Sequence, residues 1–370
     1  MSKIDELIAG LCPDGVDYRK LDSMLSYEQP GKYLVKSTDY SPSFRTPVLT
    51  AGKTFILGYT DEEEGIYNAS VDNPVILLDD FTTANRWITF PFKVKSSATK
   101  LLHCKDESLY SFKYLFYLLQ VNSYSPMEHS RQWISAFSQI EVPVPPIEVQ
   151  REVVRILDSF AELEAELEAE LEARRAQYAY YRDKLLDFTE RESVSWLKIK
   201  DVAKVLRGSY ITKKDVVPGD IPVVLGGTTP AYYHNASNHE GEGVVISRSG
   251  ANAGFASYWD QPIFVSDGFV VEGSSKALTK YLFHWLGSSH GALGGMRRGS
   301  GVPHITGKML KESQIPVPPL SEQRRIVDIL DRFEALTTSL SDGLPAEIEA
   351  RRQQYEHYRD KLLDFSRKVA

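Results

Sequence analysis

The chain of 370 residues has only two cysteines, Cys12 and Cys104, and neither stands near a cluster of histidines or other cysteines. This scarcity argues against a disulfide framework and against a structural zinc site. No run of 18 apolar residues occurs, so we expect no membrane-spanning helix. The N-terminal residues lack a basic region followed by an apolar stretch, which predicts no signal peptide and a place in the reducing cytoplasm.

Recognisable catalytic motifs are also missing. Residues 51–54 (AGKT) resemble the end of a phosphate-binding loop, but Pro47 stands where that loop needs glycine, and a strand-like run follows. The chain contains no HExxH, Gly-x-Ser-x-Gly or Cys-x-x-Cys motif, and no Asn-Pro-Pro-aromatic tetrapeptide of the kind that amino-methyltransferases use. Its histidines are scattered without metal-ligand spacing. We therefore predict no catalytic residue and no metal site in this chain.

What the chain does contain is an internal repeat. Residues 143–160 (PVPPIEVQREVVRILDSF) and 316–333 (PVPPLSEQRRIVDILDRF) are identical at 11 of 18 positions. Residues 173–188 (ARRAQYAYYRDKLLDF) and 350–365 (ARRQQYEHYRDKLLDF) are identical at 13 of 16 positions. The segments before each copy are similar in length and barely alike in sequence. This organisation predicts a scaffold of repeated helices that carries two different binding domains.

The net charge of −7 is unevenly distributed along the chain. Residues 141–193 carry −7, largely from glutamates at alternate positions between Glu162 and Glu172, whereas residues 194–314 carry +4. Local patches, and not the charge of the whole chain, decide which ligands a surface attracts. The acidic total therefore does not exclude nucleic acid as a partner of the segments before each repeat copy.

Apolar residues recur at steps of three and four from Val153 to Phe188, which predicts a single helix across residues 147–188. Such a helix would be about 60 Å long at about 1.5 Å per residue. The second copy has four extra residues near SDGLP (341–345), where glycine and proline favour a helix end and a new helix start. We expect one long helix in the first copy and a kinked or split helix in the second.

The two helical copies are expected to pack against each other, although each could instead pack only on its own globular domain. A long helix with a single apolar stripe needs a partner, because an average helix has only about a dozen residues. The predicted packing residues are Leu163, Leu167, Leu171, Tyr178, Tyr181, Leu185, Leu336, Leu340, Ile348, Tyr355, Tyr358 and Leu362.

The proline motifs at residues 142–146 and 315–319 are predicted to be extended linkers. Each proline fixes φ and biases the preceding residue toward extended geometry. A ligand for an SH3-type domain is the alternative that such a motif leaves open. Gln150 and Gln323 follow in the first helical turns, where they could take part in capping.

Each segment before a repeat copy is predicted to be an α+β domain with a small β-rich core. Both segments contain KYLF, at residues 113–116 and 280–283, which we expect to open a short amphipathic helix. Short apolar runs bounded by Gly, Pro, Asn and Asp predict strands joined by tight turns. These runs lie at residues 74–78, 87–92, 221–225, 243–246 and 269–271.

Loops of both domains carry basic, amide and aromatic residues that could contact DNA, although any single one of them could instead be a solvated surface residue. Arginine and lysine pair with phosphates or with the O6/N7 edge of guanine, and asparagine reads adenine. The run 294–301 is the most specific candidate for a DNA contact, because it places two arginines between glycines. The candidates are Arg45, Lys53, Tyr59, Asn85, Arg86, Lys93, Lys95, Lys100 and Arg131 in the first domain, and Arg207, Lys213, Lys214, Arg248, Asn252, Lys276, Arg297, Arg298, His304 and Lys308 in the second.

The repeat motifs resemble those of the specificity subunits of Type I restriction-modification enzymes. The resemblance covers nearly the whole chain and is carried by the two PVPP motifs and the two ARR motifs with their following helices. It implies an α+β fold in which two globular α/β target recognition domains are separated by a long antiparallel two-helix coiled coil, with an internal pseudo-twofold repeat. The implied boundaries are residues 1–142 and 191–315 for the recognition domains and 143–190 and 316–370 for the helical regions.

The same resemblance implies a function and a set of partners. The chain would be a non-catalytic subunit that reads a bipartite site in double-stranded DNA and directs two methyltransferase subunits and the restriction subunits. S-adenosylmethionine, ATP and magnesium would belong to those partners, and the protein would be prokaryotic, cytoplasmic and associated with the nucleoid. The alternative is a two-headed coiled-coil adaptor that binds proteins, which would place aromatic residues at the domain tips and show no steep dependence on salt.

Overall fold

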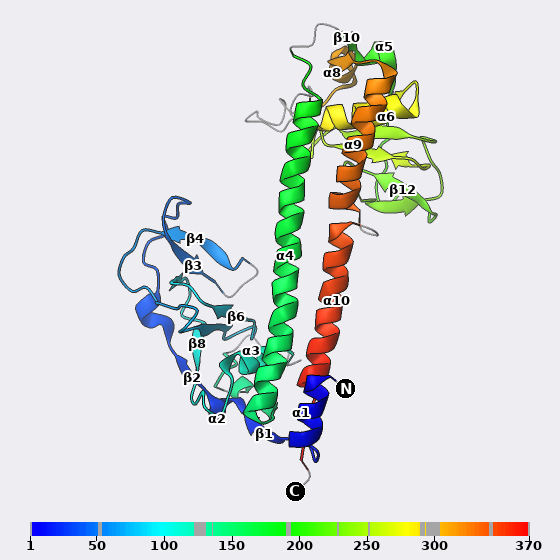
Figure 1. Cartoon of the computed structure of the whole chain (residues 1–370). Coiled ribbons are helices and arrows are strands. Elements are labelled where there is room, and N and C mark those ends of the chain that lie inside the picture. Colours follow the sequence, from blue (N-terminus) through cyan, green and yellow to red (C-terminus); the bar gives the residue numbers. More distant parts are fainter. Residues whose placement is uncertain are drawn as a thin grey trace. The chain divides into compact units, whose positions relative to one another are not determined.

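A computed structural model describes residues 2–50, 54–121, 131–134, 136–189, 194–227, 229–250, 252–288, 293, 304–339 and 343–368. The chain forms two compact units. Unit 1 comprises Met1–Ala165 and Glu349–Ala370, and unit 2 comprises Glu166–Ile348. Each unit combines one β-rich domain with helices from both copies of the repeat (Figure 1). The α+β class that we expected is confirmed.

The long helices follow the repeat. Helix α4 (Ile147–Leu185) is continuous over 39 residues, whereas the second copy forms two helices, α9 (Leu320–Thr338) and α10 (Leu344–Leu363). Gly343 lies at the break, and a β-carbon there would stand 2.6 Å from the carbonyl oxygen of Ala335 in the last turn of α9. Glycine thus permits the close approach at which one helix ends and the next begins. The single helix and the split helix are both confirmed.

Within each unit, a phenylalanine of one repeat copy stacks on a tyrosine of the other copy. In unit 1, the ring centroids of Phe160 in α4 and Tyr358 in α10 lie 5.5 Å apart. In unit 2, those of Phe333 in α9 and Tyr181 in α4 lie 5.6 Å apart. A second tyrosine contacts each phenylalanine, in the pairs Phe160–Tyr355 at 6.4 Å and Phe333–Tyr178 at 6.5 Å. The two copies therefore do pack against each other, by the same contacts in both units.

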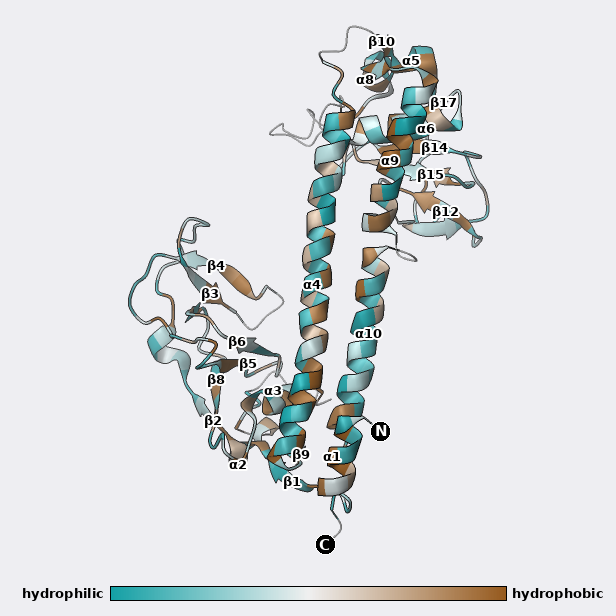
Figure 2. Cartoon of the chain, viewed as in Figure 1, coloured by the Kyte–Doolittle hydropathy of each residue, from teal (hydrophilic) through white to brown (hydrophobic). Residues whose placement is uncertain are grey.

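The helix pair of unit 1 is antiparallel. Phe160 contacts Tyr358, whereas Glu164, one turn later in α4, binds Arg352 at 2.6 Å, earlier in α10. Figure 2 shows α4 and α10 as mostly hydrophilic helices with separated hydrophobic residues, as a narrow seam requires. Of the predicted packing residues, Leu167, Leu171 and Ile348 are buried, Leu163, Tyr178, Leu185, Tyr355 and Leu362 are half-buried, Tyr181, Leu336 and Tyr358 are 38% exposed, and Leu340 lies outside the described residues.

The domain of unit 1 has three layers. A four-stranded sheet has the order β2-β8-β5-β6, and a three-stranded sheet has the order β4-β3-β7. Ile76 and Leu78 of the first sheet pack with helix α3 (Phe112–Val121), whereas Val75 and Leu77 pack with the second sheet, because alternate residues of a strand face opposite sides. The strands are β2 (Leu25–Glu28), β3 (Thr46–Leu49), β4 (Ile56–Thr60), β5 (Val75–Asp79), β6 (Asn85–Ile88), β7 (Lys93–Val94) and β8 (Thr99–Cys104).

The domain of unit 2 repeats this fold strand for strand. Its sheets have the orders β11-β17-β14-β15 and β13-β12-β16, and helix α6 (Lys276–Gly287) packs where α3 packs in unit 1. The strands are β11 (Ala203–Arg207), β12 (Ile221–Val224), β13 (Tyr232–His234), β14 (Gly243–Ser247), β15 (Ala256–Trp259), β16 (Phe264–Val265) and β17 (Gly268–Gly273). Two segments that are barely alike in sequence therefore share one framework. KYLF lies in a helix in both, but it stands at the start of the helix, as predicted, only in α3, since α6 begins four residues before it.

Most of the predicted strands are confirmed, but the run at residues 87–92 is a strand only as far as Ile88. Pro91 has no N–H to donate to a sheet, and Phe92 instead forms an isolated bridge with Tyr67. The short remaining elements are α1 (Lys3–Leu11), α2 (Leu21–Met24), η1 (Pro30–Tyr33), η2 (Phe137–Gln139), α5 (Ile199–Val202) and α8 (Gly307–Glu312).

The proline motifs are paired strands and not linkers. β9 (Glu141–Val144) pairs antiparallel with β1 (Asp17–Lys20), and β18 (Gln314–Val317) pairs antiparallel with β10 (Ser195–Lys198). A two-stranded sheet consists of edge strands only, where proline is tolerated. The predicted extended geometry is correct, but each motif is tied to the beginning of its own domain.

A set of buried hydrogen bonds fixes these strands to the helices in the same way in both units. The glutamine of each first helical turn donates to a proline carbonyl before the helix, so it does not cap helical N–H groups as predicted. The tyrosine of each KYLF motif donates to a proline carbonyl within the strand itself. The bonds are Gln150 to Pro145 and Gln323 to Pro318, both 2.8 Å, Tyr114 to Pro143 at 3.2 Å and Tyr281 to Pro316 at 2.8 Å.

Both cysteines are free thiols, with Cys12 buried and Cys104 half-buried. Among the helices in the described part of the chain, none combines the length and the apolar character needed to cross a membrane.

Candidate nucleic-acid interface

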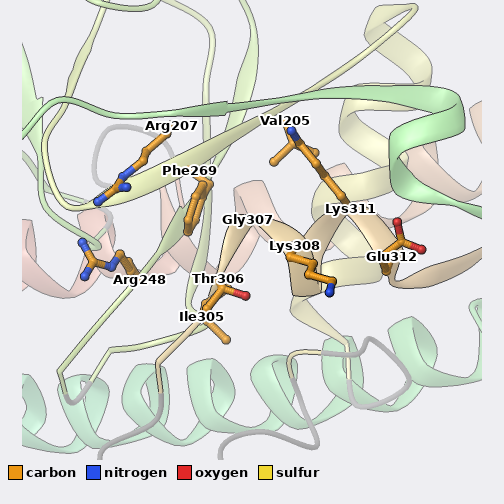
Figure 3. A pocket seen from close by; sticks show the side chains of 10 residues that line it. All are labelled: Val205, Arg207, Arg248, Phe269, Ile305, Thr306, Gly307, Lys308, Lys311 and Glu312. Carbon is orange, nitrogen blue, oxygen red and sulfur yellow. The ribbon is translucent and has the colours of Figure 1, made fainter.

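A basic groove of about 560 Å³ opens on the domain of unit 2 (Figure 3). Four cationic side chains line it, Arg207, Arg248, Lys308 and Lys311, with Phe269 and Ile305 among the apolar residues between them. Figure 3 shows the guanidinium groups of Arg207 and Arg248 at the same end of the groove, beside the ring of Phe269. This arrangement suits a negatively charged ligand with flat apolar faces.

The central sheet positions the two arginines. Arg207 ends β11 and pairs with Phe269 of β17. Arg248 follows β14 directly, and its backbone is held on both sides, because its N–H donates to Asp267 O at 3.2 Å and its carbonyl accepts from the N–H of Ile305 at 2.9 Å. The groove therefore lies where rigid strand ends meet the start of α8, whose first turn is capped by the side chain of Thr306.

Carboxylates near the groove already have partners. Asp267 binds Arg248 at 3.1 Å and also accepts a hydrogen bond from Ser249. Glu312 binds Lys198 at 2.5 Å and Lys200 at 2.7 Å, and hydrogen bonds from these lysines lower its pKa to about 2. Arg207, Lys308 and Lys311 form no ion pair within the described part of the chain. The groove thus carries an excess of positive charge.

The other candidates of the second domain lie apart from the groove. Lys213, Lys214, Asn252 and His304 are exposed but do not line it. Lys276 binds Glu242 at 2.5 Å. Lys311 lines the groove although the sequence did not single it out, because its place depends on α8 lying beside β11. The predicted residues Lys53, Arg297 and Arg298 lie outside the described residues.

The matching position in unit 1 has the opposite charge. The register of the sheets places Asp80 where unit 2 has Arg248, and Lys100 where unit 2 has Phe269. Both side chains are 1% exposed and lie 3.3 Å apart, and Asp80 also accepts a hydrogen bond from the N–H of Trp133 at 2.8 Å. Lys100 is therefore a buried partner of Asp80, so its prediction as a DNA contact is wrong.

Lys93 is a second wrong candidate. Its side chain is 2% exposed, binds Glu62 at 2.8 Å and donates to the carbonyl of Glu64. The hydrogen bond from Lys93 is the main cause that lowers the pKa of Glu62 to about 2. A lysine buried with its counter-charge serves the packing of the domain and cannot reach a phosphate.

The remaining candidates of the first domain are more accessible. Arg86 lies over the ring of Phe55 at 5.6 Å and Lys95 over that of Tyr40 at 5.7 Å, so aromatic faces orient two exposed cations. Arg45 and Arg131 are exposed, and Tyr59 and Asn85 are half-buried, with Asn85 donating to the carbonyl of Thr83 at 3.3 Å.

A polar junction recurs where each short helix meets the repeat. In unit 1, Asp158 accepts from Tyr117 and lies 3.5 Å from Lys113. In unit 2, Asp331 pairs with Lys280 and lies 2.9 Å from His284. His284, Asp331 and nearby Glu334 could bring ligand atoms within 4.8 Å of one another, but the first two already contact each other and Asp331 also binds Lys280.

A family model described as the Type I restriction modification DNA specificity domain matches the chain twice, over residues 13–173 and 192–350. Among curated relatives, the specificity subunit of the Type I restriction enzyme EcoR124I/EcoR124II from Escherichia coli is 39% identical over 99% of this chain and 97% of the relative. A putative type I restriction enzyme specificity subunit from Haemophilus influenzae is 30% identical over 95% of this chain and 96% of the relative.

Two solved structures share the fold. The S subunit of a Type I restriction-modification system from M. genitalium matches with a TM-score of 0.60 and 15% identity, over 94% of this chain and 95% of that chain. A chain from a structure that concerns complex assembly and conformational transition of the type I R-M system matches with a TM-score of 0.58 and 16% identity. The match covers 95% of this chain and 98% of that chain. At these identities the likeness concerns the fold alone.

Proposed function

Because the chain belongs to the family of Type I restriction-modification specificity subunits, we propose that its two domains each read one half of a bipartite site in double-stranded DNA. Members of this family give a Type I system its DNA sequence specificity and are non-catalytic. The protein-binding adaptor is not favoured, since the groove of unit 2 is lined by cations and not by a cluster of exposed aromatic side chains.

The observation that carries the proposal is that one framework occurs twice with different side chains at matched positions. Asp80 and Arg248 follow the same strand of the two domains, and one is acidic while the other is basic. A framework that keeps its strands and changes the side chains at the ends of those strands suits two readers of different base sequences. The target would then be asymmetric, and α4, whose residues belong to both units, would set the spacer between its halves.

We extend the proposal to the partners. The junction of short helix, proline strand and long helix recurs in both units, so a partner that recognises it would find two equivalent sites; this supports two methyltransferase subunits per chain. Restriction subunits would complete the complex. S-adenosylmethionine, ATP and magnesium would be held by the partner subunits, and the assembly would lie with the nucleoid in the cytoplasm of a prokaryote.

Adenine methylation tests this function directly. The chain would be expressed with its methyltransferase subunit in a host free of other methylation, and long-read sequencing would map N6-methyladenine across the genome. We expect one split motif with a fixed spacer. Unmethylated DNA, although the two subunits form a folded complex, would refute the proposal and favour the adaptor.

Salt dependence gives an independent readout. Binding that neutralises six or more phosphates weakens by about 10³-fold or more between 50 and 200 mM salt. Fluorescence anisotropy of the complex with a labelled duplex would measure this slope. A nearly flat slope would contradict a DNA-reading role.

A further inference from the structure

We infer that Arg248 reads a guanine in the half-site bound by unit 2, and that Arg207, Lys308 and Lys311 hold the DNA backbone at the same groove. The inference rests on the proposed function. It adds that the base is guanine, that Arg248 reads it, and that Asp267 orients the guanidinium of Arg248. It follows from the geometry of the groove and from the contrast with unit 1.

Both the backbone and the guanidinium of Arg248 are held in place. Its backbone is tied to Asp267 and Ile305 at the end of a buried strand, so its Cα has little freedom. The carboxylate of Asp267 holds one terminal nitrogen of the guanidinium at 3.1 Å, while the side chain remains 38% exposed. A guanidinium held on one side keeps its other N–H donors in a fixed plane, as bidentate pairing with guanine O6 and N7 requires.

The other cations of the groove differ from Arg248 in having no carboxylate that orients them within the described part of the chain. Arg207, Lys308 and Lys311 are exposed and have no carboxylate partner in the described part of the chain. The nearest acid of the groove lining, Glu312, already binds Lys198 and Lys200. Such exposed unpaired cations suit phosphates, which carry charge but no sequence information.

The contrast with unit 1 assigns the guanine contact to one half-site only. At the position of Arg248, unit 1 has Asp80, which is buried with Lys100 and holds the N–H of Trp133. Among the described residues, neither Asp80 nor Lys100 offers an exposed donor or a free cation at this position. The first domain must therefore read its half-site with other residues, so the two halves of the target differ in how they are read.

The experiment compares variants of the full chain in complex with its methyltransferase subunit. Arg248→Lys keeps the charge and removes the planar fork, so we expect the preference for guanine at one position of one half-site to fall about 5- to 150-fold, equal to 1–3 kcal/mol. Asp267→Asn should relax the same position less strongly. Methylation mapping gives the motif of each variant, and competition binding with substituted duplexes gives the fold-change.

Two further variants separate base reading from charge. The double variant Arg207→Ala/Lys308→Ala should weaken binding to all duplexes alike and reduce the salt slope by about 2, without changing the motif. Lys204→Ala, which removes a lysine paired with Glu272 outside the groove, is the matched control and should leave the motif and the slope unchanged.

The outcomes distinguish this inference from the proposed function. If the unaltered complex methylates a split motif and Arg248→Lys changes neither half, or changes a position that is not guanine, the inference is overturned and the function stands. If Asp267→Asn leaves the guanine preference intact, Asp267 does not orient the reader. If the unaltered complex methylates no DNA at all, the proposed function itself is refuted.

Discussion

The buried cation of Lys93 depends on a single carboxylate. Replacing Glu62 by alanine would leave that ammonium with only the carbonyl of Glu64, and breaking a buried pair in this way costs about 3 kcal/mol. We expect Glu62→Ala to lower the free energy of unfolding by about this amount, measured by denaturant titration. The neighbouring exposed Glu63 gives the control, since Glu63→Ala should change stability by less than about 0.5 kcal/mol. Equal losses for the two variants would show that the ion pair is not stabilising.

Glu334 gives unit 2 a pH-dependent stability. Burial, and then the charge of Asp331, raise its pKa to about 7. The folded chain thus keeps this proton up to about pH 7, whereas the unfolded chain loses it near the ordinary value of 4.5. Because the folded state binds the proton more tightly, the contribution of this group to stability is complete below pH 4.5 and falls as the pH rises toward 7.

Glu334→Gln removes that dependence. We expect the variant to be more stable than the parent at pH 8, on the order of 2 kcal/mol, and to gain nothing at pH 4.5. Thermal unfolding at both pH values measures the difference. Glu166→Gln, on an exposed face of α4, should show no such pH-dependent gain. A gain of the same size at both pH values would contradict a titrating Glu334.

At the scale of elements, the break between α9 and α10 depends on one glycine. A β-carbon at Gly343 would meet the carbonyl oxygens of Ala335 at 2.6 Å and Leu336 at 2.9 Å, so the two helices would have to move apart. We expect Gly343→Ala to cost about 1–3 kcal/mol of unfolding free energy. Gly10→Ala is the control, because its added carbon meets nothing within 4 Å and alanine favours the helix α1 by about 0.5–1 kcal/mol. Stabilisation by both substitutions would refute the close approach.

Elements with local signals were predictable from the sequence. Steps of three and four predict α4, and the glycine and proline at 343 and 345 predict the break, because helix contacts join residues close in the chain. The proline motif of β9 gave its extended geometry but not its partner β1, since strand pairing joins residues distant in the chain. Sequence reasoning therefore identified the elements and missed the sheets that hold the proline strands.

The candidate interface was predictable only in part for the same reason. The sequence identified Arg207, Arg248 and Lys308 of the groove, because charged residues in loops are usually exposed. Lys93 and Lys100 break that rule because Glu62 and Asp80, which no local pattern connects to them, bury them as ion pairs. The strand-for-strand match of the two domains was not predicted beyond their common α+β class and the shared KYLF motif, because few of their sequence positions are alike.

At the scale of the whole molecule, we propose that α4, whose residues belong to both units, sets the spacing of the two half-sites. Four residues inserted near Glu166 add about 6 Å and about one turn, so the apolar seam on either side keeps its direction. We expect such a variant to methylate a motif with both half-sites unchanged and a longer spacer. Genome-wide methylation mapping gives both quantities in one experiment, and altered half-site sequences would show that α4 does not set the spacing.

The stacking of Phe160 on Tyr358 also dictates an order of events during synthesis. Unit 1 contains residues that are translated before all of unit 2, yet it also needs residues 349–368, which are translated after unit 2 and include Ser366 and Lys368, whose backbones pair with Val16 at 2.9 Å. Every residue of unit 2 is available earlier. The domain translated first is thus the one completed last, and a transcript cut before Glu349 would yield a finished second domain beside an unfinished first one.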